Sequence, residues 1–402
     1  MPIKYVAYTE DGQRVSGLLD VDSTADAEEK LWGSNLIVVQ LKRVRRLPSK
    51  YELLPTLFRV KTSGLISFAR DLSFLLESGI PLFRSLHLLL PRIYNRRLRV
   101  TLEGVIQNIA SGNSLSQSLA KYPDIFPTIF TRLVRVGEET GGLAEVLHRV
   151  ITYMERQEDL ARKVKKATTY PAMVFVVGIA GAVVLVTFAM PQLTTLFTEF
   201  GAEIPTAARM LIALSGWLEN NGMYVLAGMA VAGIAFWRYV STARGRRKWD
   251  YYVLRIPRVG MIVSSSNLAR FTSTLEVLLT AGVPLVEAVS LLRVVSTNTA
   301  FIDASGQIET DLLTGQSFSE SLSKYPVFPN MTVQMINVAE EGGGLSTSLE
   351  RQSRFYEEET DRAIASTTSL IEPLAIIVVA ILVGFVAISM FTAIYSLIGQ
   401  IQ

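Results

Sequence analysis

Two pairs of adjacent glutamates are the first residues of this sequence whose types and spacing could do chemistry. Glu138 and Glu139 stand in "VGEETGGL", and Glu340 and Glu341 stand in "VAEEGGGL". Each pair closes one predicted helix, where carboxylates are unfavourable, and lies just before a glycine-rich break and the start of the next helix, where they are favourable. Two interpretations follow: a helix cap at a turn, or an acidic corner that binds a partner or a cation. The recurrence of the pair supports the second.

The other polar residues argue against several kinds of catalytic and metal site. The chain has no cysteine and two histidines, His87 and His148. This composition excludes disulfides, thiolate metal sites and cysteine nucleophiles, and two isolated imidazoles form neither a metal site nor a triad. The sequence holds no G-x-x-x-x-G-K-[ST] motif, so it offers no P-loop for a nucleotide. We therefore expect no catalytic residue, no cofactor and no metal, and a protein that is not an enzyme.

The glutamate pairs belong to an internal repeat. "LLESGIPL" returns as "LLTAGVPL", "GNSLSQSLAKYP" returns as "GQSFSESLSKYP" at the same offset, and the glutamate pairs return one residue closer. A match of this length and order predicts two copies of one structural unit. The second copy has Ser273 in place of Arg70 and Ala339 in place of Gly137. We therefore do not expect the two copies to do equal work.

Each copy has the pattern of a helical bundle. Apolar residues recur at three- and four-residue steps on both sides of the corner "SGIPL", which is typical of helices that bury one stripe. Gly79 and Gly282 are suited to end one helix with a positive φ, and Pro81 and Pro284 are suited to the first turn of the next. Further breaks at "SGNS", "YPDIFP" and "ETGG" leave about six helices per copy, the last of which runs into an apolar segment.

Three apolar segments predict transmembrane helices. They cover residues 167–190, 220–238 and 373–397, and each is close to the roughly 20 residues that cross about 30 Å of hydrocarbon. The 49% hydrophobic content of the 402-residue chain agrees with a membrane protein. The alternative of a buried core helix is strongest for 220–238, which is the shortest segment.

Flanking charge predicts the orientation of these segments. Basic residues cluster within 156–166 and again within 238–248, whereas the connecting stretch 191–219 holds a single basic residue. By the positive-inside rule both clusters face the cytoplasm. Two cytoplasmic bundles, over residues 64–166 and 239–372, then flank an extracytoplasmic loop at 191–219, and the C-terminus lies outside.

The N-terminal residues follow a different pattern. Two β-like runs surround Asp11-Gly12, a short helix is expected over 23–35, and "LIVVQLKRV" reads as a third strand. Residues 1–47 thus predict a small α+β module, joined by a basic linker, 48–63, to the first bundle. Because the N-terminus opens polar, we expect no signal peptide. The predicted fold class is a mainly α membrane protein with two homologous cytoplasmic helical bundles, three transmembrane helices and this module.

Three motifs resemble a known family. "SFARDLSFLLESGIPLFRSL", "GNSLSQSLAKYPDIFP" and "VGEETGGLAEVLHRVITYMERQ", with their second copies, look like the type II secretion system F protein family, which includes the inner-membrane platform proteins of type IV pilus machines. The resemblance covers the chain from about residue 60 to its end. It implies a scaffold without chemistry of its own that couples a cytoplasmic ring ATPase to insertion of pilin or pseudopilin subunits into a filament.

The resemblance also implies the partners and the location of the protein. The expected partners are the ring ATPase, other inner-membrane assembly proteins, pilin or pseudopilin subunits, the lipid bilayer and further copies of this chain in a homo-oligomer, but no nucleic acid. The expected location is the inner (plasma) membrane, which the chain crosses several times. Arg70 and the four paired glutamates are the candidate partner-binding residues.

A small-solute or ion transporter component is the alternative function. Transport usually places charged side chains inside the spans despite a cost of about 2.5–3.5 kcal/mol each. The apolar runs 167–190, 220–237 and 373–397 hold no charged residue. They show small residues at four-residue spacing instead, such as Gly178 with Ala182, which suits close helix packing.

Overall fold

The computed structural model describes residues 2–8, 14–20, 37–43, 60–184 and 206–401. Contacts divide the chain into two units. The first unit consists of Met1–Lys61 and Leu90–Gly104, and the second consists of Thr62–Leu89 and Val105–Gln402. The helix predicted over 23–35, most of the linker 48–63 and the first part of the loop 191–219 lie outside the described residues.

The first unit contains a three-stranded antiparallel sheet. Its strands are β1 (Pro2–Tyr8), β2 (Arg14–Asp20) and β3 (Ile37–Arg43), in the order β2-β1-β3. Tyr8 pairs with Arg14, next to the predicted turn at Asp11-Gly12. The helix of the predicted α+β module is not among the described residues, so that module stays a prediction. The short 3-10 helix η1 (Leu90–Arg92) also belongs to this unit.

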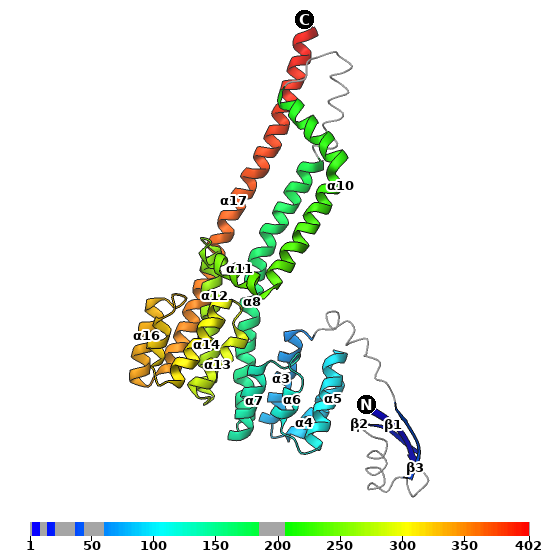
Figure 1. Cartoon of the computed structure of the whole chain (residues 1–402), viewed down its shortest axis with the longest axis vertical. Coiled ribbons are helices and arrows are strands. Elements are labelled where there is room, and N and C mark those ends of the chain that lie inside the picture. The colour runs from blue at the N-terminus through cyan, green and yellow to red at the C-terminus, as the bar shows by residue number, and fades with distance from the viewer. Residues whose placement is uncertain (1, 9–13, 21–36, 44–59, 185–205, 402) are drawn as a thin grey trace. The chain divides into compact units, whose positions relative to one another are not determined.

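The rest of the described chain is helical and follows one order twice (Figure 1). The first series is α3 (Thr62–Glu77), α4 (Leu82–Leu89), α5 (Arg96–Ala110), which spans both units, α6 (Leu115–Ala120), α7 (Thr128–Thr140) and α8 (Leu143–Val184). The second series is α12 (Val259–Thr280), α13 (Leu285–Val295), α14 (Thr299–Leu313), α15 (Phe318–Ser323), α16 (Asn330–Gly342) and α17 (Leu345–Ile401). Between them lie α10 (Thr206–Ser241) and α11 (Ala243–Arg255). The prediction of two helical copies is confirmed.

The repeated corner ends one helix and starts the next, as the sequence predicts. Gly79 has a φ of 78° and Gly282 a φ of 92°. In each copy the glycine N–H and the following N–H donate to carbonyls of the last helical turn, at 3.0 Å in the first copy and 2.9 Å in the second. This is the Schellman arrangement, which satisfies carbonyls that the helix leaves unpaired. Leu82 and Leu285 then begin α4 and α13 directly after a proline.

Within each copy the first helix packs against the last. Helix α3 contacts α8, and α12 contacts α17. An aromatic pair recurs in the two cores: Phe68 with Phe126 at 6.4 Å between ring centroids, and Phe271 with Phe328 at 4.9 Å. Large apolar side chains at corresponding positions therefore fix both cores.

Helices α8 and α17 run from a bundle core into an apolar segment without a break. Met154 of α8 is buried, whereas Val176 of the same helix is exposed. At 1.5 Å per residue, the 42 residues of α8 and the 57 of α17 span about 63 and about 85 Å. The predicted boundaries between bundle and transmembrane segment, at 166/167 and 372/373, thus fall inside continuous helices, and Pro373 lies within α17.

Apolar side chains cover the exposed surface of α10. Met223, Tyr224, Met229 and Trp237 are among its large exposed hydrophobic residues. Within the described part of the chain, Asn220–Ser241 is the one helical stretch of 22 residues that is long and apolar enough to cross a membrane. Helix α10 already begins at Thr206, so much of the segment predicted as a loop is helical. Its run of Ala, Leu and Met residues has high helix propensity, which explains this difference.

Alanine substitutions test the role of the corner glycines. Gly79→Ala and Gly282→Ala should each lower the free energy of unfolding by about 1–2 kcal/mol, because a Cβ is unfavourable at positive φ. Thermal unfolding in detergent measures this loss. Gly64→Ala is the matched control, since Gly64 lies in helix α3 with no atom near the added methyl group. Equal stability of all three variants would contradict the assigned role.

Candidate functional site

Glu138 caps a helix that lies more than twenty residues earlier in the chain. Its Oε1 accepts a hydrogen bond from the Leu115 N–H at 2.5 Å, and its Oε2 accepts one from the Ser116 N–H at 3.0 Å. Both donors open helix α6, which has only six residues. A carboxylate at this position satisfies N–H groups that have no partner within the helix and meets the positive end of its dipole.

Glu340 makes the same contact in the second copy. It accepts hydrogen bonds from the N–H groups of Phe318 (2.7 Å) and Ser319 (2.9 Å), which open helix α15, and from the Ser319 hydroxyl (2.8 Å). Burial alone would raise the pKa of Glu340, but these hydrogen bonds outweigh it and lower the pKa below its usual value. The carboxylate is therefore held in its ionised form.

Serine caps complete both helix starts. Ser114 accepts from the Gln117 N–H and Ser317 from the Glu320 N–H, each at 3.2 Å. The sequence interpretation of the glutamates as caps placed them at the Gly-Gly turn beside them. The structure places the contacts of Glu138 and Glu340 on other helices, α6 and α15, because helices α7 and α16 lie against these two.

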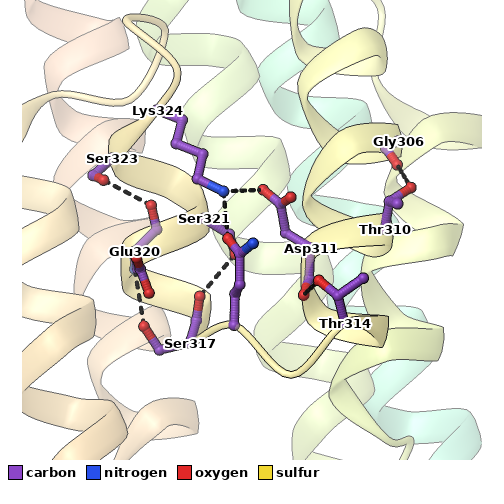
Figure 2. A network of polar contacts seen from close by, with 10 residues as sticks. Gly306, Thr310, Asp311, Thr314, Ser317, Glu320, Ser321, Ser323 and Lys324 are labelled. Carbon is purple, nitrogen blue, oxygen red and sulfur yellow. Dashed lines mark hydrogen bonds and ion pairs between the residues drawn. The ribbon is translucent and has the colours of Figure 1, made fainter.

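A lysine at the C-terminal end of each short helix bonds a residue of the preceding helix. In the second copy Lys324 donates to Asp311 of α14 at 2.9 Å and also bonds Gln316, and Figure 2 shows Lys324 reaching across to Asp311. In the first copy Lys121 bonds Asn108, the residue that corresponds to Asp311. The lysine of the motifs "SLAKYP" and "SLSKYP" thus joins each short helix to the helix before it.

The second glutamate of each pair faces solvent. Glu139 is 60% exposed and accepts from Arg135 at 2.7 Å, one turn away on α7. Glu341 accepts from the Asn337 amide at 3.3 Å in the corresponding place on α16. The two members of each pair therefore have different surroundings, and Glu139 and Glu341 are the members whose carboxylates face solvent.

Arg70 and its counterpart Ser273 lie in different environments. Arg70 is exposed on α3 and forms an ion pair with Glu155 of α8. Ser273 is buried, and its hydroxyl accepts a hydrogen bond from the Gln157 amide of α8 at 2.8 Å. Helix α12 thus contacts the last helix of the first copy as well as that of its own.

This contact between the copies was missed from the sequence. Tyr153 and Thr274 share a buried hydrogen bond of 3.0 Å, Lys163 pairs with Asp361 at 2.8 Å, and Arg132 pairs with Glu287. The available signal was the divergence of the copies, since exposed Arg70 and Asp71 are replaced by the small hydroxyl residues Ser273 and Thr274. A charge-to-hydroxyl change at a repeat position indicates burial.

A polar cleft of about 130 Å³ lies beside this contact. Its lining includes His148, Arg149, Arg156 and Glu276. Burial raises the pKa of Glu276, and the nearby Arg156 opposes that shift. Glu276 is the one carboxylate in this lining, beside two guanidinium groups and several hydroxyl groups.

The histidines do not form a site together. His87 packs edge-on against Phe83 at 4.7 Å between ring centroids, and His148 lines the cleft between the copies. Over the described residues, no three His, Cys, Asp or Glu side chains are placed to hold a metal ion.

Comparisons with known proteins reproduce the two copies. A family model described as type II secretion system (T2SS), protein F, matches residues 68–191 and 271–393. The chain is 34% identical to type IV pilus assembly protein PilC of Pseudomonas aeruginosa over 84% of this chain and 91% of that protein. It is 32% identical to PilC of Thermus thermophilus over 100% of both, and 28% identical to type II secretion system protein F of P. aeruginosa over 98% of both.

The capping glutamates generate a pH-dependent prediction. Glu340→Gln should lower the free energy of unfolding by about 0.5–2 kcal/mol at neutral pH, the usual effect of losing a helix cap. Because the folded pKa of Glu340 is lowered, its contribution is complete above the unfolded pKa near 4.5 and is lost as the pH falls through the folded value. The difference from the parent should therefore shrink in acid.

Thermal unfolding in detergent at neutral and acidic pH measures this difference. Glu139→Gln is the matched control, because its carboxylate is exposed and should change stability little at either pH. A Glu340→Gln variant as stable as the parent at neutral pH would disprove the capping role.

Proposed function

Because the chain belongs to the type II secretion system protein F family, we propose that it is an inner-membrane platform of a type II secretion or type IV pilus machine, coupling a cytoplasmic ring ATPase to insertion of pilin-like subunits into a filament. One observation supports this function most directly. Each of the two copies ends in a helix that continues from a bundle core into an exposed apolar segment.

These helices suit the transmission of movement. A continuous α-helix behaves as a stiff rod over its length, so a small tilt of a bundle displaces the far end of α8 or α17 by a larger distance. The contact of α8 with α12 and α17 joins the two copies near the point where the helices leave the bundles. A partner that turns one bundle would therefore move both rods together.

The proposed topology places both bundles in the cytoplasm. Transmembrane helices at 167–190, 220–238 and 373–397 and an extracytoplasmic segment at 191–219 follow from the apolar runs and the basic clusters. The exposed apolar side chains of α8, α10 and α17 support lipid contact, because leaving each in water costs about 1.5–3 kcal/mol.

The proposed ATPase contact uses the outward glutamates. Glu139 and Glu341 occupy corresponding positions on α7 and α16, so a ring with repeated basic surfaces could bind both copies. Pilin-like subunits and other inner-membrane assembly proteins are the remaining partners, and the working form is a homo-oligomer.

Capture experiments test the ATPase contact. The purified chain should show no ATP turnover, and it should retain the assembly ATPase of its own organism when the two are co-expressed. Glu139→Gln combined with Glu341→Gln should reduce this capture while leaving membrane abundance near normal, because exposed carboxylates add little to stability.

The matched control is a variant that combines Glu145→Gln with Asp303→Asn, which neutralises two exposed carboxylates at other places on the surface. Capture should survive in that control. Full capture by the Glu139/Glu341 variant would refute the assigned contact, and steady turnover by the isolated chain would refute the platform function.

Single cysteines test the topology in this cysteine-free chain. Ala202→Cys should react with a membrane-impermeant maleimide in intact cells, whereas Leu313→Cys, exposed at the end of α14, should react only after lysis. The reverse pattern of labelling would overturn the proposed orientation.

A further inference from the structure

The second copy docks on the first through the start of its bundle. Helix α12 lies against α8. Three hydrogen bonds join the two: Tyr153 with Thr274 (3.0 Å), Gln157 with Ser273 (2.8 Å) and Arg149 with the Thr280 carbonyl (3.3 Å). One face is therefore the last helix of a copy, and the other is the first helix of the next.

The repeat supplies a second example of each face. Helix α17 corresponds to α8, and helix α3 corresponds to α12. The counterparts of Arg149, Tyr153 and Gln157 on α17 are Arg351, Phe355 and Glu359, and the counterparts of Ser273, Val277 and Thr280 on α3 are Arg70, Phe74 and Glu77.

Both counterpart faces expose an aromatic side chain. Phe355 is 44% exposed, whereas the corresponding Tyr153 is 8% exposed. Phe74 is 67% exposed, whereas the corresponding Val277 is 4% exposed. The chain thus buries one pair of faces against itself and leaves the equivalent pair at the surface.

Two pairs of positions on the exposed faces are complementary in charge. Superposing the α8–α12 contact on them would place Glu359 where Gln157 lies, opposite Arg70 at the place of Ser273. It would also place Arg351 where Arg149 lies, opposite Glu77 at the place of Thr280. The hydrogen bonds Gln157–Ser273 and Arg149–Thr280 would thus be replaced by two pairs of opposite charge, with Phe74 near Phe355 between them. Complementary charges of this kind select partner and register.

A groove continues the α17 face. It has a volume of about 580 Å³ and lies between α16 and α17, lined by Gln334, Met335, Val338 and Arg351 among others. The corresponding surface of the first copy, at Arg132 of α7, is where α13 of the second copy pairs through Glu287. Arg84 of α4 is the residue that corresponds to Glu287, and the Gln334 carbonyl is able to accept from it.

We propose that α17 and the groove beside it bind the α3–α4 corner of a second copy of this chain, in the geometry that α8 and α12 use within one chain. This inference rests on the homo-oligomer in the proposed function and names its interface. The contact joins unlike faces, so it generates a ring where the rotation closes and an open chain where it does not.

The interchain contact should be weaker than the internal one. The internal contact includes the ion pair of Lys163 with Asp361. Between two chains Ala365 and Asp159 would take these places, and alanine cannot form an ion pair with Asp159. The two new pairs are exposed, so added salt should dissociate the chains.

Cross-linking in native membranes tests the interface with the full chain, which contains no cysteine. Two differently tagged chains are co-expressed, one with Arg70→Cys and one with Glu359→Cys, and treated with a short bis-maleimide. We expect a cross-linked product that carries both tags. Chains that carry both Arg70→Cys and Glu359→Cys should give a series of cross-linked oligomers. If the chains close into a ring, the series should stop at the number of chains in that ring. Gln157→Cys with Ser273→Cys in one chain is the matched internal control, and it should cross-link without forming a dimer.

Charge reversal gives the decisive comparison. Adding Glu77→Arg to the first chain, or Arg351→Glu to the second, should abolish most of the product, and adding both should restore it. No product beside a working internal control would overturn the interface, and so would a product insensitive to either single reversal. Capture of the ATPase without cross-linking would refute this interface and support the platform function. Cross-linking without capture would support this interface and count against the platform function.

Discussion

The packing of helix α8 is the constraint on which the rest of the structure depends. It contacts α3 within its own copy and both α12 and α17 of the second copy. Leu147 and Val150 are completely buried along it. One helix therefore closes the first bundle, contacts the second and continues into an apolar segment.

This packing explains why the two copies have diverged. Helix α12 packs against both α8 and α17, so Ser273 and Thr274 are buried where Arg70 and Asp71 are exposed. An arginine and an aspartate at the buried positions would lose hydration without gaining matched partners, which is unfavourable. Gly137 diverges for a steric reason within its own copy. A Cβ there would lie 3.0 Å from the Leu143 Cα, whereas the second copy holds Ala339 beside an open groove.

The acidic corners combine two tasks in adjacent residues. Successive residues of a helix point about 100° apart, so one carboxylate of each pair reaches the N-terminus of a neighbouring short helix while the next faces solvent. The inner contact holds α6 and α15 in place, and the outer carboxylates then stand at a fixed position on the surface. The inner residue of each pair therefore contributes to stability, and the outer residue is the one available for the proposed binding of a partner.

Sequence alone determined the features that depend on near neighbours along the chain. Helical periodicity, the positive φ of Gly79 and Gly282, the serine caps and the two ordered copies all follow from local steric and hydrogen-bonding preferences. Tertiary structure decided which glutamate of each pair is a cap, since Glu138 bonds a backbone N–H 23 residues away. It also decided that α12 docks on α8, the last helix of the other copy. The exchange of Arg70 and Asp71 for Ser273 and Thr274 indicates a buried face on α12, but only the packing of the whole chain shows that α8 covers it while the corresponding face of α3 stays at the surface.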